Sequence, residues 1–150
     1  MHQDWPANLT VVAVTLGLVA TCVLVHYEGL VLTQRIISRQ RRHRRVKVME
    51  AISMLIVLHM VEIAIFGLAY WVVLDWPQHG SIAPATSHLF DHLYFSAVTY
   101  TTVGYGDLAP VGPVRFMAGV ESLMGLVLIT WSASFTYLEM ERFWRETRGR

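Results

Sequence analysis

The sequence predicts an all-α membrane protein with three membrane-spanning helices and one short helix that enters the membrane and returns. Three apolar runs of the 150-residue chain are long enough to cross a bilayer. Hydrophobic residues make up 54% of the chain and charged residues 15%, a composition typical of a chain that lies mainly in lipid. A shorter amphipathic run, followed by a glycine-rich segment, separates the last two apolar runs.

The first apolar run covers residues 9–32, and residues 5–27 contain no Asp, Glu, Lys or Arg. At 1.5 Å per residue such a helix reaches about 34 Å, which is enough to cross the hydrocarbon core. The single cysteine, Cys22, lies within this run, so no disulfide can form inside the chain. We expect this helix to brace the second span from the lipid side.

Seven positive charges lie in the thirteen residues 35–47, which begin with Arg35 and end with Lys47. Between two membrane spans, such a cluster predicts a cytoplasmic loop by the positive-inside rule. Anionic lipid head groups are its candidate partners, and nucleic acid is not expected. The arginines are crowded among polar neighbours, whereas a voltage sensor carries them at every third position of an apolar helix.

The second span covers residues 48–74 and carries His59 and Glu62, one helical turn apart on one face. Placing an ionisable side chain at this depth costs free energy, so such a residue raises the hypothesis of a function. For His59 and Glu62 we nevertheless favour a structural role, as a hydrogen-bonded contact between helices. A proton-sensing or metal-binding pair stays open, with His26 or Glu28 of the first span as a further member. Two ligands at this spacing indicate a metal only weakly, and we expect His26 to lie nearer the inner surface than His59.

An outer loop of residues 75–86 leads to a predicted helix of residues 88–101, with Ser87 as its N-cap and Asp91 in its first turn. At about 21 Å this helix is too short to cross. It can instead dive halfway and direct its C-terminal carbonyl groups, which favour a cation, toward a central cavity.

Residues 101–107 read Thr-Thr-Val-Gly-Tyr-Gly-Asp. A non-helical backbone at membrane depth must line a watery path or be buried in protein. Gly104 and Gly106 readily adopt positive φ, and alternating left- and right-handed dihedrals turn successive carbonyl oxygens to one side. A ring of such oxygens replaces the hydration shell of a cation about the size of potassium. Thr102 can add its hydroxyl at the inner end, and Asp107 places negative charge at the outer end.

This heptapeptide resembles the selectivity filter of potassium channels, and residues 87–137, about a third of the chain, resemble their pore helix, filter and inner helix. The resemblance is to a small prokaryotic type with one extra N-terminal membrane helix. It implies a homotetramer that conducts K⁺ passively and is not an enzyme, with K⁺ as the permeant ion and no cofactor. The implied ion-binding residues are Thr102, Val103, Gly104, Tyr105 and Gly106.

The resemblance also implies residues that support the filter, among them Thr101. Tyr94 and Phe95 stand where many family members carry two tryptophans. We therefore expect both to pack around Tyr105, with the Tyr94 hydroxyl bonded to Asp107.

A carboxylate found behind the filter of some bacterial members is replaced here by Val98. Glu121 of the last span lies at a similar depth. We expect Glu121 to bond hydroxyls of the short helix, such as those of Thr99 or Thr101, and so to supply the missing support.

The last apolar run, residues 114–137, corresponds to the inner helix of the family. Gly125 matches the hinge glycine of the family when a one-residue gap is allowed. Gly119 is a second flexible or close-packing point. Ile129 and Ala133, one and two turns beyond Gly125, are candidates for an apolar cavity lining.

These assignments divide the chain into an N-terminal helix with its basic segment (residues 1–47), a pore domain (48–138) and a short cytoplasmic tail (139–150). With the filter mouth outside, the N-terminus is outside and the C-terminus cytoplasmic. Eleven of the twelve Lys and Arg residues then lie inside a multi-pass protein of the cell membrane, Arg115 being the exception.

Two other classes stay open. A pore subunit of a potassium uptake system uses the same fold, usually with four repeats in one long chain. A non-conducting membrane adaptor would tolerate a broken filter, whereas this filter is intact. The gate is undetermined, with bundling of the inner helices, filter collapse, protonation and lipid binding as candidates.

Overall fold

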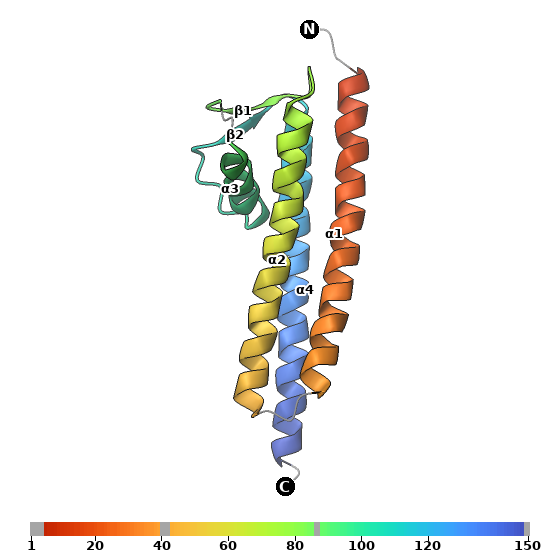
Figure 1. Ribbon diagram of the computed structural model, residues 1–150, viewed down its shortest axis with the longest axis vertical. Coiled ribbons are helices and arrows are strands. Elements are labelled where there is room, and N and C mark those ends of the chain that lie inside the picture. Colours follow the sequence, from red (N-terminus) through yellow and green to blue (C-terminus); the bar gives the residue numbers. More distant parts are fainter. Residues whose placement is uncertain (1–4, 40–42, 86–87, 149–150) are drawn as a thin grey trace.

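Three long helices lie side by side in the computed structural model, which describes residues 5–39, 43–85 and 88–148 (Figure 1). A shorter helix lies beside them near one end of the bundle, flanked by two short strands. In chain order the elements are α1 (Trp5–Arg39), α2 (Arg44–Leu74), β1 (Ser81–Ala83), α3 (Leu89–Tyr100), β2 (Ala109–Val111) and α4 (Val114–Arg148).

Helices α1, α2 and α4 are the three predicted spans, since each is long and apolar enough to cross a membrane. The prediction of an all-α membrane protein is therefore confirmed. The helices are longer than the apolar runs, because α1 continues to Arg39 and α2 starts at Arg44. The basic segment predicted as a loop is thus largely helical, and arginine is a good helix former. Of that segment, residues 40–42 lie outside the described residues.

Helix α1 packs against both α2 and α4, so it braces more than the second span alone. Its buried residues recur every three, four or seven positions, which places them on one face of the helix. They are Ala7, Val11, Thr15, Cys22, His26, Leu30, Thr33 and Ile37.

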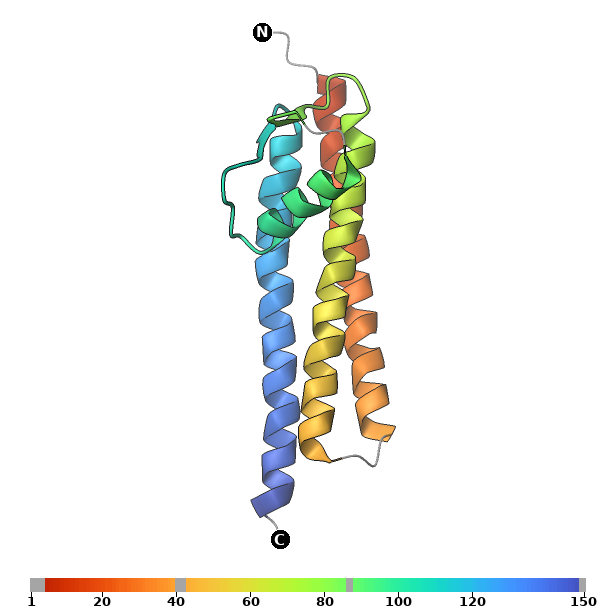
Figure 2. The same cartoon turned by 60° about the vertical axis from the view of Figure 1, so that its left-hand side comes forward.

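Helix α3 is the short re-entrant helix, with 12 residues and a length of about 18 Å. It packs against α2 and α4, and the chain after it turns back toward the strands (Figure 2). Asp91 lies in its first turn, as predicted. The predicted N-cap, Ser87, lies outside the described residues. The residue at the cap position is His88, which makes no side-chain capping bond.

A two-stranded ladder joins the outer loop to the segment that follows the glycine-rich stretch. Strand β1 pairs antiparallel with β2, with Ile82 opposite Pro110. Only a loop was expected before α3, because three-residue strands are too short to show an alternating pattern. The ladder holds both ends of the α3 hairpin at one level of the molecule.

The core between α2, α3 and α4 is aromatic and contains several buried polar side chains. Phe66 and Tyr70 of α2 meet Phe95 and Tyr100 of α3 in one buried cluster. Burying a polar group costs free energy unless the group is hydrogen-bonded, so we expect the polar residues of this core to have hydrogen-bond partners. The buried polar residues of the described chain are Thr15, His26, Thr33, Glu62, His92, Ser96, Glu121 and Ser132.

Candidate functional site

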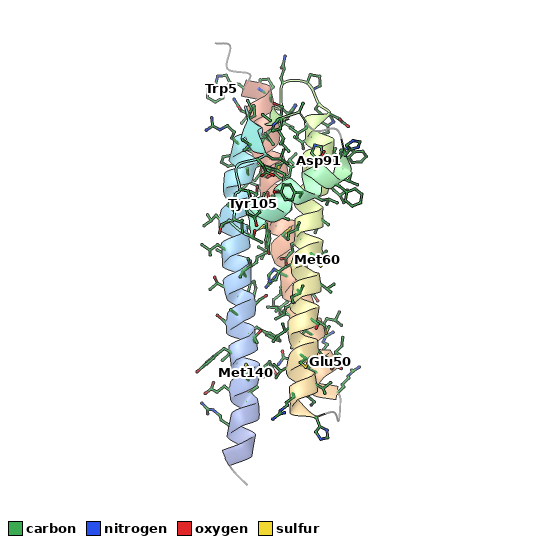
Figure 3. All side chains as sticks on the ribbon, turned by 90° about the vertical axis from the view of Figure 1, so that its left-hand side faces the viewer. Trp5, Glu50, Met60, Asp91, Tyr105 and Met140 are labelled. Carbon is green, nitrogen blue, oxygen red and sulfur yellow. The ribbon has the colours of Figure 1, made fainter. Side chains whose placement is uncertain are left out.

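The segment after α3 has the alternating backbone that the sequence predicted. Left-handed φ values occur at Thr102 (59°), Gly104 (51°) and Gly106 (83°), and the residues between them have none. Alternation of this kind is the backbone pattern from which we expect successive carbonyl groups to turn to one side. In Figure 3, Tyr105 lies in front of α4, on the side of the bundle that faces the viewer.

The two glycines of this segment are required by conformation rather than by space within the chain. A Cβ atom built on Gly104 or Gly106 would meet no atom within 4 Å. A side chain at positive φ is nevertheless strained, by roughly 1–2 kcal/mol per residue. Thr102 carries such strain, which is typical of functional sites.

Backbone hydrogen bonds fasten this segment to the end of α3. The Gly104 N–H donates to the Val98 carbonyl at 3.1 Å, and the Thr102 N–H donates to the Thr99 carbonyl at 3.0 Å. The Thr101 hydroxyl donates to the carbonyl of Ala97 in its own helix at 2.7 Å. The position of α3 therefore sets the position of the segment.

Tyr94 and Asp107 form the predicted hydrogen bond at the outer end, with 2.8 Å between the Tyr94 hydroxyl and Oδ2 of Asp107. This bond raises the pKa of Tyr94 above its ordinary value, because ionisation would place a second negative charge beside the carboxylate. Phe95 packs edge-on against Tyr70, with ring centroids 5.0 Å apart, whereas Tyr105 is 73% exposed. A contact between Phe95 and Tyr105 stays a prediction.

Glu121 supports α3 as predicted, but through a different hydroxyl. The fully buried Glu121 accepts hydrogen bonds from Ser96 Oγ and from the Tyr70 hydroxyl, both at 2.6 Å. The prediction of Thr99 or Thr101 as its partner was wrong. Ser96 lies on the buried face of α3, whereas Thr101 is exposed and Thr99 half-buried.

A second buried carboxylate, Glu62, gathers partners from three helices. Its Oε1 lies 2.8 Å from Nδ1 of His26 on α1, and its Oε2 lies 3.0 Å from Nδ1 of His59. The Tyr100 hydroxyl of α3 donates to Oε2 of Glu62 and lies 2.9 Å from Nδ1 of His59. The predicted helix contact is thus present, and it extends to the residue that precedes Thr101.

His26 was predicted to lie nearer the inner surface than His59, and this was wrong, since their ring centroids are 5.5 Å apart. Helix α1 ends at Arg39 and α2 begins at Arg44, and the two helices lie antiparallel. His26 precedes the end of α1, and His59 follows the beginning of α2, by roughly four helical turns each. The two rings therefore lie at the same depth.

Gly125, the candidate hinge, is a point of close contact between α4 and α3. A Cβ atom at Gly125 would lie 2.1 Å from the carbonyl oxygen of Tyr100, whereas one at Gly119 would meet nothing within 4 Å. Helix α4 continues through Gly125, and a hinge there stays a prediction. Ile129 and Ala133 are exposed, and their role as a cavity lining also stays a prediction.

An open groove runs along the face that carries residues 102–106. Residues 101–107 are exposed, and the groove wall includes Thr99, Ser122 and Gly119 behind them. One chain therefore forms only one side of the predicted ion path.

Sequence reasoning missed Ser96, Tyr100 and Tyr70, whose hydroxyls bind the two buried carboxylates. The sequence does contain a pattern that could have identified Ser96 and Tyr100. Ser96 and Tyr100 are hydroxyl-bearing residues four positions apart on one helix, so they share a face. Two intramembrane glutamates call for such donors.

Comparison with known proteins gives a family and several relatives. The family model described as "Ion channel" matches residues 54–141, more than half of the chain. An inward rectifier potassium channel, Kirbac3.1 of Paramagnetospirillum magnetotacticum, is 33% identical over 99 residues, 65% of this chain. A hyperpolarization-activated voltage-gated potassium channel of Methanocaldococcus jannaschii is 43% identical over 37 residues, 25% of this chain. Protein LctB of Bacillus caldotenax is 28% identical over 121 residues, 75% of this chain.

The two potassium channels are much longer than the matched part. The alignments cover 31% of Kirbac3.1 and 18% of the Methanocaldococcus channel, whereas they cover 85% of Protein LctB. No solved structure gives a significant match.

Proposed function

This chain belongs to the ion channel family and is of the potassium channel pore type, and we propose that it conducts K⁺ passively and selectively through a pore formed by four copies. The observation that carries the proposal is the alternation of left-handed and ordinary φ values across residues 102–106. Such a backbone presents a row of carbonyl oxygens to a dehydrated cation. Membership of the ion channel family also means that the chain is not an enzyme.

In this proposal the carbonyl groups of Thr102, Val103, Gly104 and Tyr105 coordinate the K⁺ ions in a row. Gly106 allows the backbone to leave the row, and repulsion between neighbouring ions assists exit. The intact Gly-Tyr-Gly sequence favours potassium over sodium.

Four copies are proposed because one chain leaves its filter uncovered. Val103 is 53% exposed and Tyr105 73% exposed on the open face. Unsatisfied peptide groups at membrane depth cost several kcal/mol each, so this backbone must be shielded from lipid by other protein or by a watery path, and a ring of copies provides both. Each chain supplies one filter strand, and four strands surround an ion.

The charge distribution supports an orientation with the filter mouth outside. The beginning of α1 and the β1–β2 ladder lie at one end of the bundle, and the end of α1 and the beginning of α2 lie at the other (Figure 1). The basic segment that includes these two helix ends carries seven positive charges between Arg35 and Lys47. The positive-inside rule then assigns this end to the cytoplasm, where anionic lipid head groups are candidate partners.

Ion flux into liposomes tests the proposal. We expect wild-type protein to carry K⁺ and not Na⁺. Gly104→Val should lower K⁺ flux at least tenfold, because a β-branched residue is a strong outlier at the φ of +51° found there. Gly17→Val is the matched control, since Gly17 lies in α1 with no atom within 4 Å of an added Cβ. It should leave flux unchanged.

Equal K⁺ and Na⁺ flux in the wild type would contradict selectivity. A stable tetramer without flux, at several values of pH and in several lipids, would favour the non-conducting adaptor. Flux that is unaffected by Gly104→Val would show that ions take another path. Particles of another subunit number, measured by native mass spectrometry, would contradict the four-copy arrangement.

A further inference from the structure

We propose that His26, His59 and Glu62 form a binding site for a divalent transition-metal ion of the zinc class. Each residue offers one ligand atom, and these atoms all lie within 4.8 Å of one another. Imidazole nitrogen and carboxylate oxygen are ligands that zinc prefers in proteins. Within the part of the chain that the structure describes, no other group of three His, Cys, Asp or Glu residues comes together in this way.

The distances require only a small adjustment of the cluster. Oε1 of Glu62 lies 2.8 Å from Nδ1 of His26, and Oε2 lies 3.0 Å from Nδ1 of His59. Zinc lies about 2.0–2.2 Å from such ligands, so neighbouring ligand atoms in a tetrahedral site are about 3.3–3.5 Å apart. The two imidazoles contact different oxygens of Glu62, and the ligand atoms of the three residues lie within 4.8 Å of one another, so changes of roughly 0.5–1.5 Å in these separations bring them to tetrahedral spacing.

Tyr100 borders the site as a hydrogen-bond partner. Its hydroxyl oxygen lies 2.9 Å from Nδ1 of His59 and donates a hydrogen bond to Glu62. The three residues of the cluster supply two imidazole nitrogens and one carboxylate, and three protein ligands with water in the fourth position form a tetrahedral zinc site.

The surroundings of His26 suit a ligand that binds through Nδ1. Such a histidine carries its proton on Nε2, and an acceptor for that proton holds the ring in place. Nε2 of His26 lies 3.5 Å from Oγ of Ser132 on α4, and the Trp131 ring packs at 5.2 Å from the imidazole. Helix α4 therefore packs against the first ligand, although it contributes none itself.

The three ligands differ in their burial. His26 and Glu62 are fully buried, whereas the His59 side chain is 18% exposed. Glu62 offsets part of the charge of a divalent ion, which is necessary in an apolar surrounding. A bound ion would join α1 and α2 at one point. The site is separate from the K⁺ path, so it does not depend on the function proposed above.

Zinc binding to the full-length protein, purified without a histidine tag and treated with a chelator, tests this site. After addition of ZnCl₂ and gel filtration, we expect one zinc per chain and a higher temperature of unfolding. His26→Gln and His59→Gln should each weaken zinc binding at least tenfold. The matched control is His88→Gln, because His88 is an exposed histidine outside the cluster. It should bind zinc as the wild type does.

Failure of the wild-type protein to retain zinc would overturn the proposal, as would an equal loss of binding in His88→Gln. If the cluster variants fail to fold, X-ray absorption at the zinc edge of the wild-type protein identifies the ligands of the bound zinc and so tests the site. Two imidazole nitrogens with oxygen ligands would support the site. A zinc shell with more than two imidazoles, or with none, would contradict it.

Discussion

Two buried carboxylates hold the same short helix, and the difference between them is instructive. Glu121 of α4 binds the hydroxyl of Ser96, and Glu62 of α2 binds the hydroxyl of Tyr100. Both carboxylates are fully buried, and their two partners lie one turn apart on α3. Helix α3, which precedes the filter, is therefore held at two points along one face. We call the contact between Glu121 and Ser96 the first clamp, and the contact between Glu62 and Tyr100 the second clamp.

The two clamps differ in their remaining partners. The second partner of Glu121 is the hydroxyl of Tyr70, so this carboxylate is held by hydroxyl donors. Glu62 has the imidazoles of His26 and His59 beside it. Hydroxyl groups supply hydrogen bonds only, whereas imidazoles also bind metals. The first clamp is suited to support, and the second can in addition respond to a ligand.

Replacing each carboxylate by alanine should give the largest difference in stability between the two clamps. Glu62→Ala leaves two imidazoles and a phenol without their acceptor, and we expect a loss of about 3–5 kcal/mol in the free energy of unfolding. Glu121→Ala leaves two hydroxyls, which should cost about 1–3 kcal/mol. Equilibrium unfolding in detergent measures both. Equal losses would mean that the imidazoles add nothing to the second clamp.

A methyl group at Gly125 tests the packing between the two clamps. Gly125→Ala places a Cβ atom 2.1 Å from the Tyr100 carbonyl oxygen, and such overpacking typically costs about 1–3 kcal/mol. Gly119→Ala is the control, since its Cβ would meet nothing within 4 Å. It should be neutral or stabilise α4 slightly. Similar thermal unfolding of the two variants would contradict the close contact.

Deleting one phenolic hydroxyl from each clamp tests whether the two clamps contribute equally to stability but unequally to ion selectivity. Tyr70→Phe and Tyr100→Phe each remove a hydrogen bond to a buried carboxylate, and each should cost about 1.5–3 kcal/mol in the free energy of unfolding. Tyr100 directly precedes Thr101 at the start of the filter segment. The ratio of K⁺ to Na⁺ flux should therefore fall further in Tyr100→Phe. A larger fall of this flux ratio in Tyr70→Phe would mean that the first clamp, and not the second, supports the selectivity of the filter.

The smallest effect is expected at the exposed outer end. Tyr94→Phe removes the bond to Asp107 and should lower the unfolding temperature only slightly. Because this bond raises the pKa of Tyr94 above 10.0, its stabilisation is complete below pH 10.0 and is lost as the pH rises through the raised value. The difference from wild type should thus be constant from pH 6 to about pH 9. A difference that disappears in that interval would argue against the bond.

The alternating backbone of the filter could be predicted from the sequence, since it depends on neighbouring residues, here the spacing of Gly104 and Gly106. The bond between Tyr94 and Asp107 was also predicted, from the resemblance to the pore of potassium channels. The sequence also predicted that Glu121 supports α3, because a buried carboxylate needs donors.

Features that depend on the relative depth of helices were harder to predict. Ser96 rather than Thr99 binds Glu121, because the rotation of α3 about its axis decides which hydroxyl faces α4. The level of His26 depends on where α1 ends and α2 begins, and basic residues within both helix ends obscured these boundaries. The contact at Gly125 depends on how closely α4 approaches α3, which helical periodicity does not report.

Cryo-electron microscopy of the full-length protein in lipid nanodiscs with K⁺ would test the central claim most directly. We predict four chains around one axis, with the carbonyl oxygens of residues 102–105 facing that axis and density for ions between them. An assembly of another size, or carbonyl groups turned away from the axis, would contradict the proposal that this chain forms a potassium-selective pore.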